Sequence, residues 1–293
     1  MNAIIFSLFS PSQLSDKVIE NCNLEIGDAV LRDFPDGETF IKINSDVQNR
    51  DVIVMTSLNY PNNKILPLLF FSRTVKELGA KKIGLIAPYL AYMRQDKNFS
   101  TGECISSRYF ADLLSQNFDW LLTIDPHLHR YKYLDEVYTT PTFTLHAKEK
   151  IVKWIQGNVK NPIIIGPDAE SKQWVSSIAD SANIPYLILQ KIRRGDREVE
   201  VSIPQIHEFR FHTVVLIDDI ISTGNTMIEA IKHLKKSEVK SVICIGIHAL
   251  FAKNSYEALK QSGCSIITCN TIDHNTNAID LSSLIVHVLA TLN

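Results

Sequence analysis

The residues from Thr213 to Thr226 bring acidic, hydroxyl and small side chains together between two apolar segments. Val214 to Ile217 form an unbroken run of Val, Leu and Ile, which indicates a strand buried on both faces. Asp218 and Asp219 follow this run, and a small polar loop then extends from Ser222 to Thr226. Beyond the loop, one face of a helix is indicated by the spacing of Met227, Ala230, Ile231 and Leu234.

This order of strand, acidic pair, loop and helix has a chemical meaning. A loop of Ser, Thr, Gly and Asn at a helix start offers backbone N–H groups and hydroxyls to a phosphate. Asp218 and Asp219 would repel that phosphate unless they accept hydrogen bonds from sugar hydroxyls or hold a divalent cation. A phosphorylated sugar would satisfy both halves of the segment, whereas an ordinary strand-to-helix turn with an Asp near the helix start is the alternative.

The segment from Asp218 to Thr226 resembles the loop that binds the ribose 5-phosphate part of phosphoribosyl pyrophosphate (PRPP). Type I phosphoribosyltransferases and PRPP synthetases share this loop, in which a second Gly often stands where this chain has Asn225. The resemblance therefore implies a ligand class and not a reaction. The ribose 5-phosphate-binding residues that it implies are Asp218, Asp219, Ser222, Thr223, Gly224, Asn225 and Thr226.

A turn signal lies at residues 34–38, where Pro and Gly surround an Asp between two extended segments. From the residues alone, a plain hairpin turn explains this segment. It is also similar to the FPDGE motif of PRPP synthetases, whose Phe, Asp and Glu help hold the adenine of ATP, generally from a neighbouring subunit. The resemblance implies this role for Phe34, Asp36 and Glu38.

A charged run follows the predicted strand Lys82–Ala87, at the position where ligands gather in α/β sheets. Arg and Lys there could clamp a triphosphate and Gln could contact a base edge, although a solvated loop would also be charged. The run resembles the RQDK region of PRPP synthetases, and the residues around Gly102 and Ser106 resemble the archaeal-type branch. This implies that ATP is bound by Arg94, Gln95, Asp96 and Lys97.

Two further strand ends carry candidate metal ligands. Asp125, His127 and His129 follow the predicted strand Trp120–Ile124, and Asp168 follows the strand Pro162–Ile165. Asp and His at strand ends suit a divalent metal or polyphosphate site, but exposed loop histidines and a helix-capping Asp remain alternatives. In PRPP synthetases the equivalents of His127 and Asp168 bind magnesium–ATP and magnesium, which implies Mg²⁺ as cofactor.

The chain departs from the family pattern just after Asp168. Many members place Gly and Ala two and three residues beyond this Asp, which lets the backbone approach a ligand. Here Glu170 and Ser171 occupy these positions. Because Glu170 adds bulk and charge, either the helix start is repositioned or the affinity for an anionic ligand is altered.

Four basic residues among seven surround Gly195 in the segment from Lys191 to Arg197. This composition predicts a cationic loop, and a solvated connection between two strands is the alternative. In PRPP synthetases this position holds a flexible catalytic loop whose Lys and Arg stabilise the reacting phosphates. The resemblance implies that Lys191 and Arg193 are the catalytic residues.

The pattern of strand, loop, helix and strand occurs twice. It begins at Asp51–Met55 and again at Val214–Ile217, and both copies span about 30 residues, the size of a βαβ unit. We therefore predict two related parallel α/β halves. The resemblance implies two type I phosphoribosyltransferase-like domains with parallel sheets flanked by helices, at residues 1–143 and 144–280. Residues 281–293 form a predicted helix packed on a domain or an interface.

Composition limits the classes of partner. A net charge of −2 over 293 residues gives no indication of a nucleic-acid or membrane surface. Five cysteines without a CxxC pair favour reduced thiols. Ala3 to Phe9 read as a strand without a basic leader, and no apolar run approaches the roughly 18 residues that cross a bilayer. We therefore expect a cytoplasmic protein.

Nearly the whole chain carries these motifs in the order typical of PRPP synthetases. The resemblance implies transfer of the pyrophosphoryl group of ATP to the 1-hydroxyl of ribose 5-phosphate, which gives PRPP and AMP. It also implies a homo-oligomer built from dimers. A type I phosphoribosyltransferase and a catalytically silent homologue with a regulatory role are the alternatives, and Glu170 with Ser171 is the main argument for the silent homologue.

Overall fold

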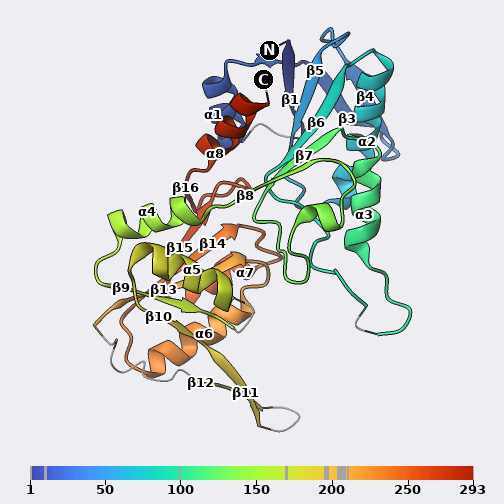
Figure 1. The fold of residues 1–293 in the computed structure, drawn as a ribbon. Coiled ribbons are helices and arrows are strands. Elements are labelled where there is room, and N and C mark those ends of the chain that lie inside the picture. The colour runs from blue at the N-terminus through green and yellow to red at the C-terminus, as the bar shows by residue number, and fades with distance from the viewer. Residues whose placement is uncertain are drawn as a thin grey trace. The chain divides into compact units, whose positions relative to one another are not determined.

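The computed structural model describes residues 2–9, 12–98, 100–168, 171–194, 198–202, 209 and 211–292, without the side chains of residues 173, 190–194 and 198–202. The chain divides into two compact units. Unit 1 comprises Met1–His146 together with Leu281–Asn293, and unit 2 comprises Ala147–Asp280. The chain therefore passes from one unit to the other twice (Figure 1).

Unit 1 is built on a six-stranded sheet in the order β2-β1-β5-β6-β7-β8, in which every neighbouring pair is parallel. Helices cover the sheet, so its central strands are rich in Ile, Val and Leu and buried on both faces. The strands are β1 (Ala3–Ser7), β2 (Glu25–Ile26), β5 (Asp51–Met55), β6 (Lys82–Ala87), β7 (Trp120–Ile124) and β8 (Thr142–Leu145). The helices are α1 (Gln13–Cys22), α2 (Asn62–Glu77), α3 (Ser106–Ser115), the 3₁₀ turn η1 (Leu134–Glu136) and α8 (Ser282–Thr291).

A separate antiparallel hairpin in unit 1 joins β3 (Ala29–Asp33) to β4 (Thr39–Ile43). Strand β4 packs against α2. The predicted turn at residues 34–38 connects these two strands, because Pro35 fixes one backbone angle and Gly37 takes a φ of +88°. Phe34, Asp36 and Glu38 therefore lie at the tip of a hairpin.

Unit 2 repeats the architecture of unit 1. Its sheet has the order β10-β9-β13-β14-β15-β16, and again every neighbouring pair is parallel. The strands are β9 (Pro162–Gly166), β10 (Tyr186–Ile188), β13 (Thr213–Ile220), β14 (Ser241–His248), β15 (Ser265–Cys269) and β16 (Asn277–Ile279). The helices are α4 (Lys148–Asn158), α5 (Lys172–Ala182), α6 (Asn225–Lys236) and α7 (Ser255–Gln261).

The two sheets confirm the predicted fold class of two related parallel α/β halves. The β5-α2-β6 segment occupies the same places in its sheet order as β13-α6-β14 does in the other. The last helix of the chain also has a counterpart: α8 packs on α1 in unit 1, as α4 packs on α5 in unit 2. Figure 1 shows α1 and α8 side by side.

Two local predictions were wrong. Strand β13 was predicted to end at Ile217 but continues through Asp218 and Asp219 to Ile220. Residues 190–194 form a strand, β11, paired with β12 (Glu198–Ser202), where a loop was predicted. Residues 198–202 alternate between polar residues and Val, which favours a strand over an open loop in this segment. Within the described residues, no helix combines the length and apolar character that a membrane crossing requires.

Candidate functional site

The loop from Ser222 to Gly224 connects β13 to α6 in unit 2. Gly224 stands directly before the helix with a φ of +69°, a conformation that glycine adopts without strain. No described side chain caps this helix end, so its first N–H groups are directed towards the loop without an intrahelical acceptor. The loop therefore has the geometry of an anion-binding helix N-terminus.

The neighbouring strand supports this loop through its backbone. The N–H of Ile221 donates to the carbonyl of His248 at 3.1 Å, and the N–H of Phe251 donates back to the carbonyl of Ile221 at 2.9 Å. The N–H of Ala252 donates to the carbonyl of Ser222 at 3.1 Å. Three hydrogen bonds thus fix the start of the loop, and the hydroxyl residues that follow remain accessible or partly accessible.

Close packing adds a further constraint. A Cβ atom at Gly246 would lie 2.6 Å from the side chain of Ile221, because β14 passes directly beside the loop. Only glycine leaves room for this approach. The backbone position of Ile221, and with it the start of the loop, therefore depends on Gly246.

Three carboxylates gather at the carboxyl ends of the adjacent strands β9 and β13. The N–H of Asp219 donates to Oδ1 of Asp218 at 3.1 Å, and the N–H of Ile220 donates to Oδ1 of Asp219 at 2.7 Å. Burial, followed by the charges of Asp219 and Asp168, raises the pKa of Asp218 well above its usual range. A bound cation would relieve the repulsion among these acids.

Asp168 itself is held by the residues that follow it. Its Oδ1 accepts a hydrogen bond from the N–H of Ser171 at 3.1 Å, and its carbonyl accepts one from the Ser171 hydroxyl at 2.7 Å. Ser171 packs so closely on Gly166 that a Cβ at this glycine would lie 2.4 Å from the hydroxyl oxygen. Asp168 thus has a fixed orientation, while Glu170 lies outside the described residues.

The predicted catalytic residues Lys191 and Arg193 lie on β11, opposite Val201 and Val199 of β12. Positions two residues apart on a strand face the same side, so both residues belong to one face of the hairpin. Figure 1 shows this hairpin projecting from the body of unit 2. Their side chains lie outside the described part of the structure.

In unit 1, the four residues predicted to bind ATP lie just after β6. Arg94 and Lys97 are exposed, and Gln95 is partly buried with Oε1 accepting from the Ser106 hydroxyl at 3.0 Å. Asp96 is only 7% exposed, and its Oδ1 accepts a hydrogen bond from the guanidinium of Arg130. Arg94 and Lys97 are therefore exposed, while the buried carboxylate of Asp96 holds the run to Arg130.

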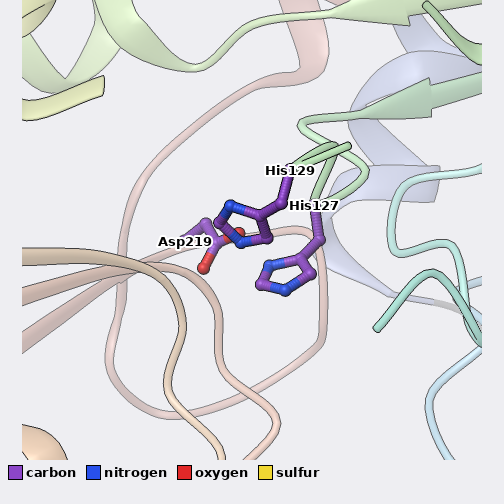
Figure 2. Close-up of side chains that lie close together, drawn as sticks. All are labelled: His127, His129 and Asp219. Carbon is purple, nitrogen blue, oxygen red and sulfur yellow. The ribbon is translucent and has the colours of Figure 1, made fainter. Parts of the chain in front are cut away.

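The loop after β7 contains the predicted metal-binding His127. Asp125 and His127 have φ values of +38° and +57°, which are unusual for residues other than glycine. Figure 2 shows the rings of His127 and His129 beside each other, with centroids 4.0 Å apart and planes at 84°. A strained backbone thus brings two imidazoles together at this strand end.

Asp125 has a partner that the sequence did not indicate. Its Oδ1 lies 2.7 Å from Nδ1 of His146, and this hydrogen bond raises the pKa of His146 although burial opposes the shift. The N–H of Asp125 also donates to the carbonyl of Leu145 at 2.9 Å. Asp125 therefore connects the ends of β7 and β8 and supports the turn that carries His127.

The adenine-site candidates Phe34, Asp36 and Glu38 occupy the β3–β4 turn. The N–H of Phe34 donates to the carbonyl of Glu38 at 2.7 Å, and Oδ1 of Asp36 accepts from the N–H of Glu38 at 3.2 Å. All three residues are exposed, and Phe34 retains 40% of its accessible surface. An exposed aromatic ring beside two carboxylates suits a purine with an exocyclic amino group.

The sequence reasoning missed Arg130 and His146. Arg130 directly follows the motif at residues 125–129, but its acidic partner is 34 residues away in the chain. His146 lies 21 residues from Asp125. Neither pairing has a local sequence signal, because each depends on which strand ends are adjacent in the sheet.

Two family models match the chain. The N-terminal domain of ribose phosphate pyrophosphokinase matches residues 3–117, and the phosphoribosyl transferase domain matches residues 134–285. Together they cover both units, and the second match alone spans more than half of the chain.

Curated relatives from several archaea share the length of this chain. The ribose-phosphate pyrophosphokinase of Saccharolobus solfataricus is 33% identical over 254 residues, which are 84% of this chain and 85% of the relative. That of Methanobrevibacter smithii is 29% identical, with 94% and 96% of the two chains covered. That of Methanopyrus kandleri is 28% identical, with 99% of each covered.

A solved structure shares the fold. The phosphoribosylpyrophosphate synthetase from Mycobacterium smegmatis superposes with a TM-score of 0.87 at 23% identity, and the match covers 100% of this chain and 99% of the other. At this identity the likeness concerns the fold.

Proposed function

Because this chain belongs to the ribose-phosphate pyrophosphokinase family, we propose that the loops described above carry out the reaction of that family. This enzyme transfers the pyrophosphoryl group of ATP to ribose 5-phosphate and produces PRPP and AMP. The 1-hydroxyl oxygen of the ribose forms a bond with the β-phosphorus, and the bond from the β-phosphorus to the α-phosphate oxygen breaks. Such chemistry depends mainly on positioning and charge neutralisation.

The observation that carries the proposal is the loop between β13 and α6. Its backbone N–H groups and the side chains of Ser222, Thr223, Asn225 and Thr226 would bind the 5-phosphate at an uncapped helix start. Asp218 and Asp219, at the end of β13, would accept hydrogen bonds from the ribose hydroxyls. Gly224 allows the close approach of the phosphate, since it has no side chain in the way.

The acidic residues of unit 2 also suit magnesium. Carboxylate oxygens are the ligands that Mg²⁺ prefers. Burial and then the charges of Asp219 and Asp168 raise the pKa of Asp218, and a divalent cation would relieve the repulsion among these acids. Asp168, oriented by Ser171, is the proposed protein ligand in this unit, and His127 is the proposed residue for magnesium–ATP in unit 1. Bound Mg²⁺ would supply charge neutralisation to the polyphosphate.

On the ATP side, Arg94, Gln95 and Lys97 are the proposed contacts to the nucleotide. Exposed Arg and Lys side chains can hold phosphate oxygens, and the carbonyl and amide of Gln95 can contact a base edge. Phe34, Asp36 and Glu38 would hold the adenine of an ATP bound by a neighbouring subunit, so the proposed assembly is a homo-oligomer built from dimers. The two small-molecule partners are ATP and ribose 5-phosphate.

Lys191 and Arg193 are the proposed catalytic residues. The reacting phosphates gain negative charge on their equatorial oxygens in the transition state, and cationic side chains stabilise this charge. Their positions two residues apart on β11 belong to one face of the hairpin. The proposed location is the cytoplasm, in keeping with the five cysteines, which are all free thiols.

The test is formation of AMP and PRPP from ATP and ribose 5-phosphate with Mg²⁺, with wild type compared with Lys191→Ala. We expect kcat to fall by at least about 100-fold, as for loss of one transition-state stabilising group. Lys153→Ala removes an exposed lysine of α4 and should leave the rate unchanged. A folded wild type that binds ATP without turnover would instead identify a silent homologue, and conversion of PRPP with a nucleobase would identify a phosphoribosyltransferase.

A further inference from the structure

One face of the β3–β4 hairpin carries a cation between two aromatic rings. Arg32 is paired with Phe40 across the strands, and Phe34 follows Arg32 by two positions, so the three side chains share a face. The guanidinium carbon of Arg32 lies 4.8 Å from the ring centroid of Phe34 and 4.4 Å from that of Phe40. The two ring centroids are 6.0 Å apart, with the planes at 87°.

The turn fixes the backbone of Phe34 but not its side chain. Backbone hydrogen bonds join Phe34 to Glu38 at 2.7 Å and to Gly37 at 2.9 Å. The ring remains 40% exposed, so the turn alone leaves its side-chain torsions free. Ordering an exposed aromatic side chain on ligand binding costs free energy, and a contact made before binding reduces this cost.

We propose that Arg32 is a positioning residue for the adenine of ATP. Its guanidinium lies over one face of the Phe34 ring and holds the ring in a single orientation, which leaves the opposite face for the purine. This inference rests on the proposed adenine-binding role of Phe34. Within that role, it assigns to Arg32 a function that the FPDGE motif does not include.

The identity of the side chain matters to this role. A planar guanidinium can contact two rings that meet edge to face, whereas a lysine ammonium is a compact and strongly hydrated charge. An attraction between a cation and an aromatic ring is worth about 0.5–1 kcal/mol at an exposed site. Converted at about 1.4 kcal/mol per tenfold change, this is roughly a two- to fivefold difference in affinity.

The exposure of Arg32 separates this role from the stability of the hairpin. Its side chain lies on the solvent side of the hairpin, while Leu31 and Ile41 on the other face are partly buried. Substitution of an exposed residue of this kind usually changes the free energy of unfolding by less than about 0.5 kcal/mol. A kinetic effect of its removal can therefore be distinguished from unfolding.

The test is a double-mutant cycle on the KM for ATP with Arg32→Met, Phe34→Ala and the double variant. We expect Arg32→Met to raise this KM about two- to fivefold, with kcat and the KM for ribose 5-phosphate unchanged. Arg32→Lys should recover part of the loss. In the Phe34→Ala background, Arg32→Met should have no further effect, because Arg32 acts through the ring.

Lys42→Met is the matched control. Lys42 lies on the same face of the hairpin as Arg32, but it is paired with Val30. This change therefore removes an exposed cation at a different position on that face. It should leave the KM for ATP unchanged. If Arg32→Met raised the KM for ATP equally with and without Phe34, the effect would come from the general charge of the hairpin, and the inference would be overturned. The same would hold if Lys42→Met raised this KM as much as Arg32→Met does. If Phe34→Ala itself left the KM for ATP unchanged, the adenine-binding role of the hairpin would fail instead.

Discussion

The sequence and the structure suggest different roles for Asp96. Its place in the RQDK-like run predicts a contact with ATP, but its carboxylate is buried and paired with Arg130. The Tyr131 hydroxyl also donates to the carbonyl of Asp96, at 3.4 Å. The pairing connects the run that contains Arg94 with the loop that contains His127, so Asp96 can position both loops without contacting the nucleotide.

We therefore expect Asp96→Asn to destabilise the protein as well as weaken ATP binding. A hydrogen bond between charged groups contributes about 1.5–3 kcal/mol, and asparagine keeps the acceptor oxygen but loses the charge, so we expect a loss of part of this free energy, which denaturant unfolding would measure. Lys97→Ala, the matched change at the next residue, should raise the KM for ATP while leaving the free energy of unfolding within about 0.5 kcal/mol. If Asp96→Asn changed only the KM, the direct contact with ATP would be the better account.

At the scale of elements, apolar runs were sufficient to predict the central strands. Val214 to Ile217 and Val52 to Met55 are buried on both faces, so their composition alone identified them. The segment from Lys191 to Arg197 was predicted as a loop because of its four basic residues around Gly195, although residues 190–194 pair with residues 198–202 as strands. The contact of Gly246 with Ile221 could not be predicted, since it depends on which strands are neighbours and in what register.

The contact between β14 and the loop that joins β13 to α6 gives a prediction for Gly246→Ala. The new Cβ would lie 2.6 Å from Ile221 and would displace it, so we expect a loss of about 1–3 kcal/mol of stability. We also expect the KM for ribose 5-phosphate to rise more than the KM for ATP. Parallel kinetics with each substrate would measure this difference.

Gly157→Ala is the matched control for that change. Gly157 lies in α4, where an added Cβ would meet no neighbouring atom within 4 Å, so alanine fits and favours the helix. Stability should rise by about 0.5–1 kcal/mol, with both KM values unchanged. Equal effects of Gly246→Ala on both substrates would indicate general unfolding of unit 2 and not a shifted loop.

At the scale of the whole molecule, the C-terminal helix α8 belongs to unit 1, although it follows unit 2 in the chain. Helical spacing predicted α8 but could not assign it to a unit, because its packing partner α1 lies near the other end of the chain. Ile285 and Leu289 are buried, as are Leu14 and Val18 of α1. Helices α1 and α8, which are far apart in the sequence, thus pack together through buried apolar side chains.

Leu289→Ala should lower the free energy of unfolding by about 2–5 kcal/mol, because it leaves a cavity where a side chain only 3% exposed had packed. His287→Ala, at an exposed position of the same helix, should change it by less than about 0.5 kcal/mol. Thermal or denaturant unfolding of the two variants measures the difference. Similar values for both would mean that α8 contributes little to unit 1.

The division of unit 1 between the two ends of the chain also affects the timing of synthesis. Helix α1 ends at Cys22 and α8 begins at Ser282, so the ribosome adds about 260 residues between them. At about 5–20 residues per second, the apolar face of α1 stays uncovered for roughly 15 to 50 seconds. Unit 2 is one continuous segment, so no part of it waits for a distant segment of the chain to be synthesised. Until α8 has been synthesised, the nascent chain therefore exposes the apolar face of α1, and we expect a chaperone to bind there.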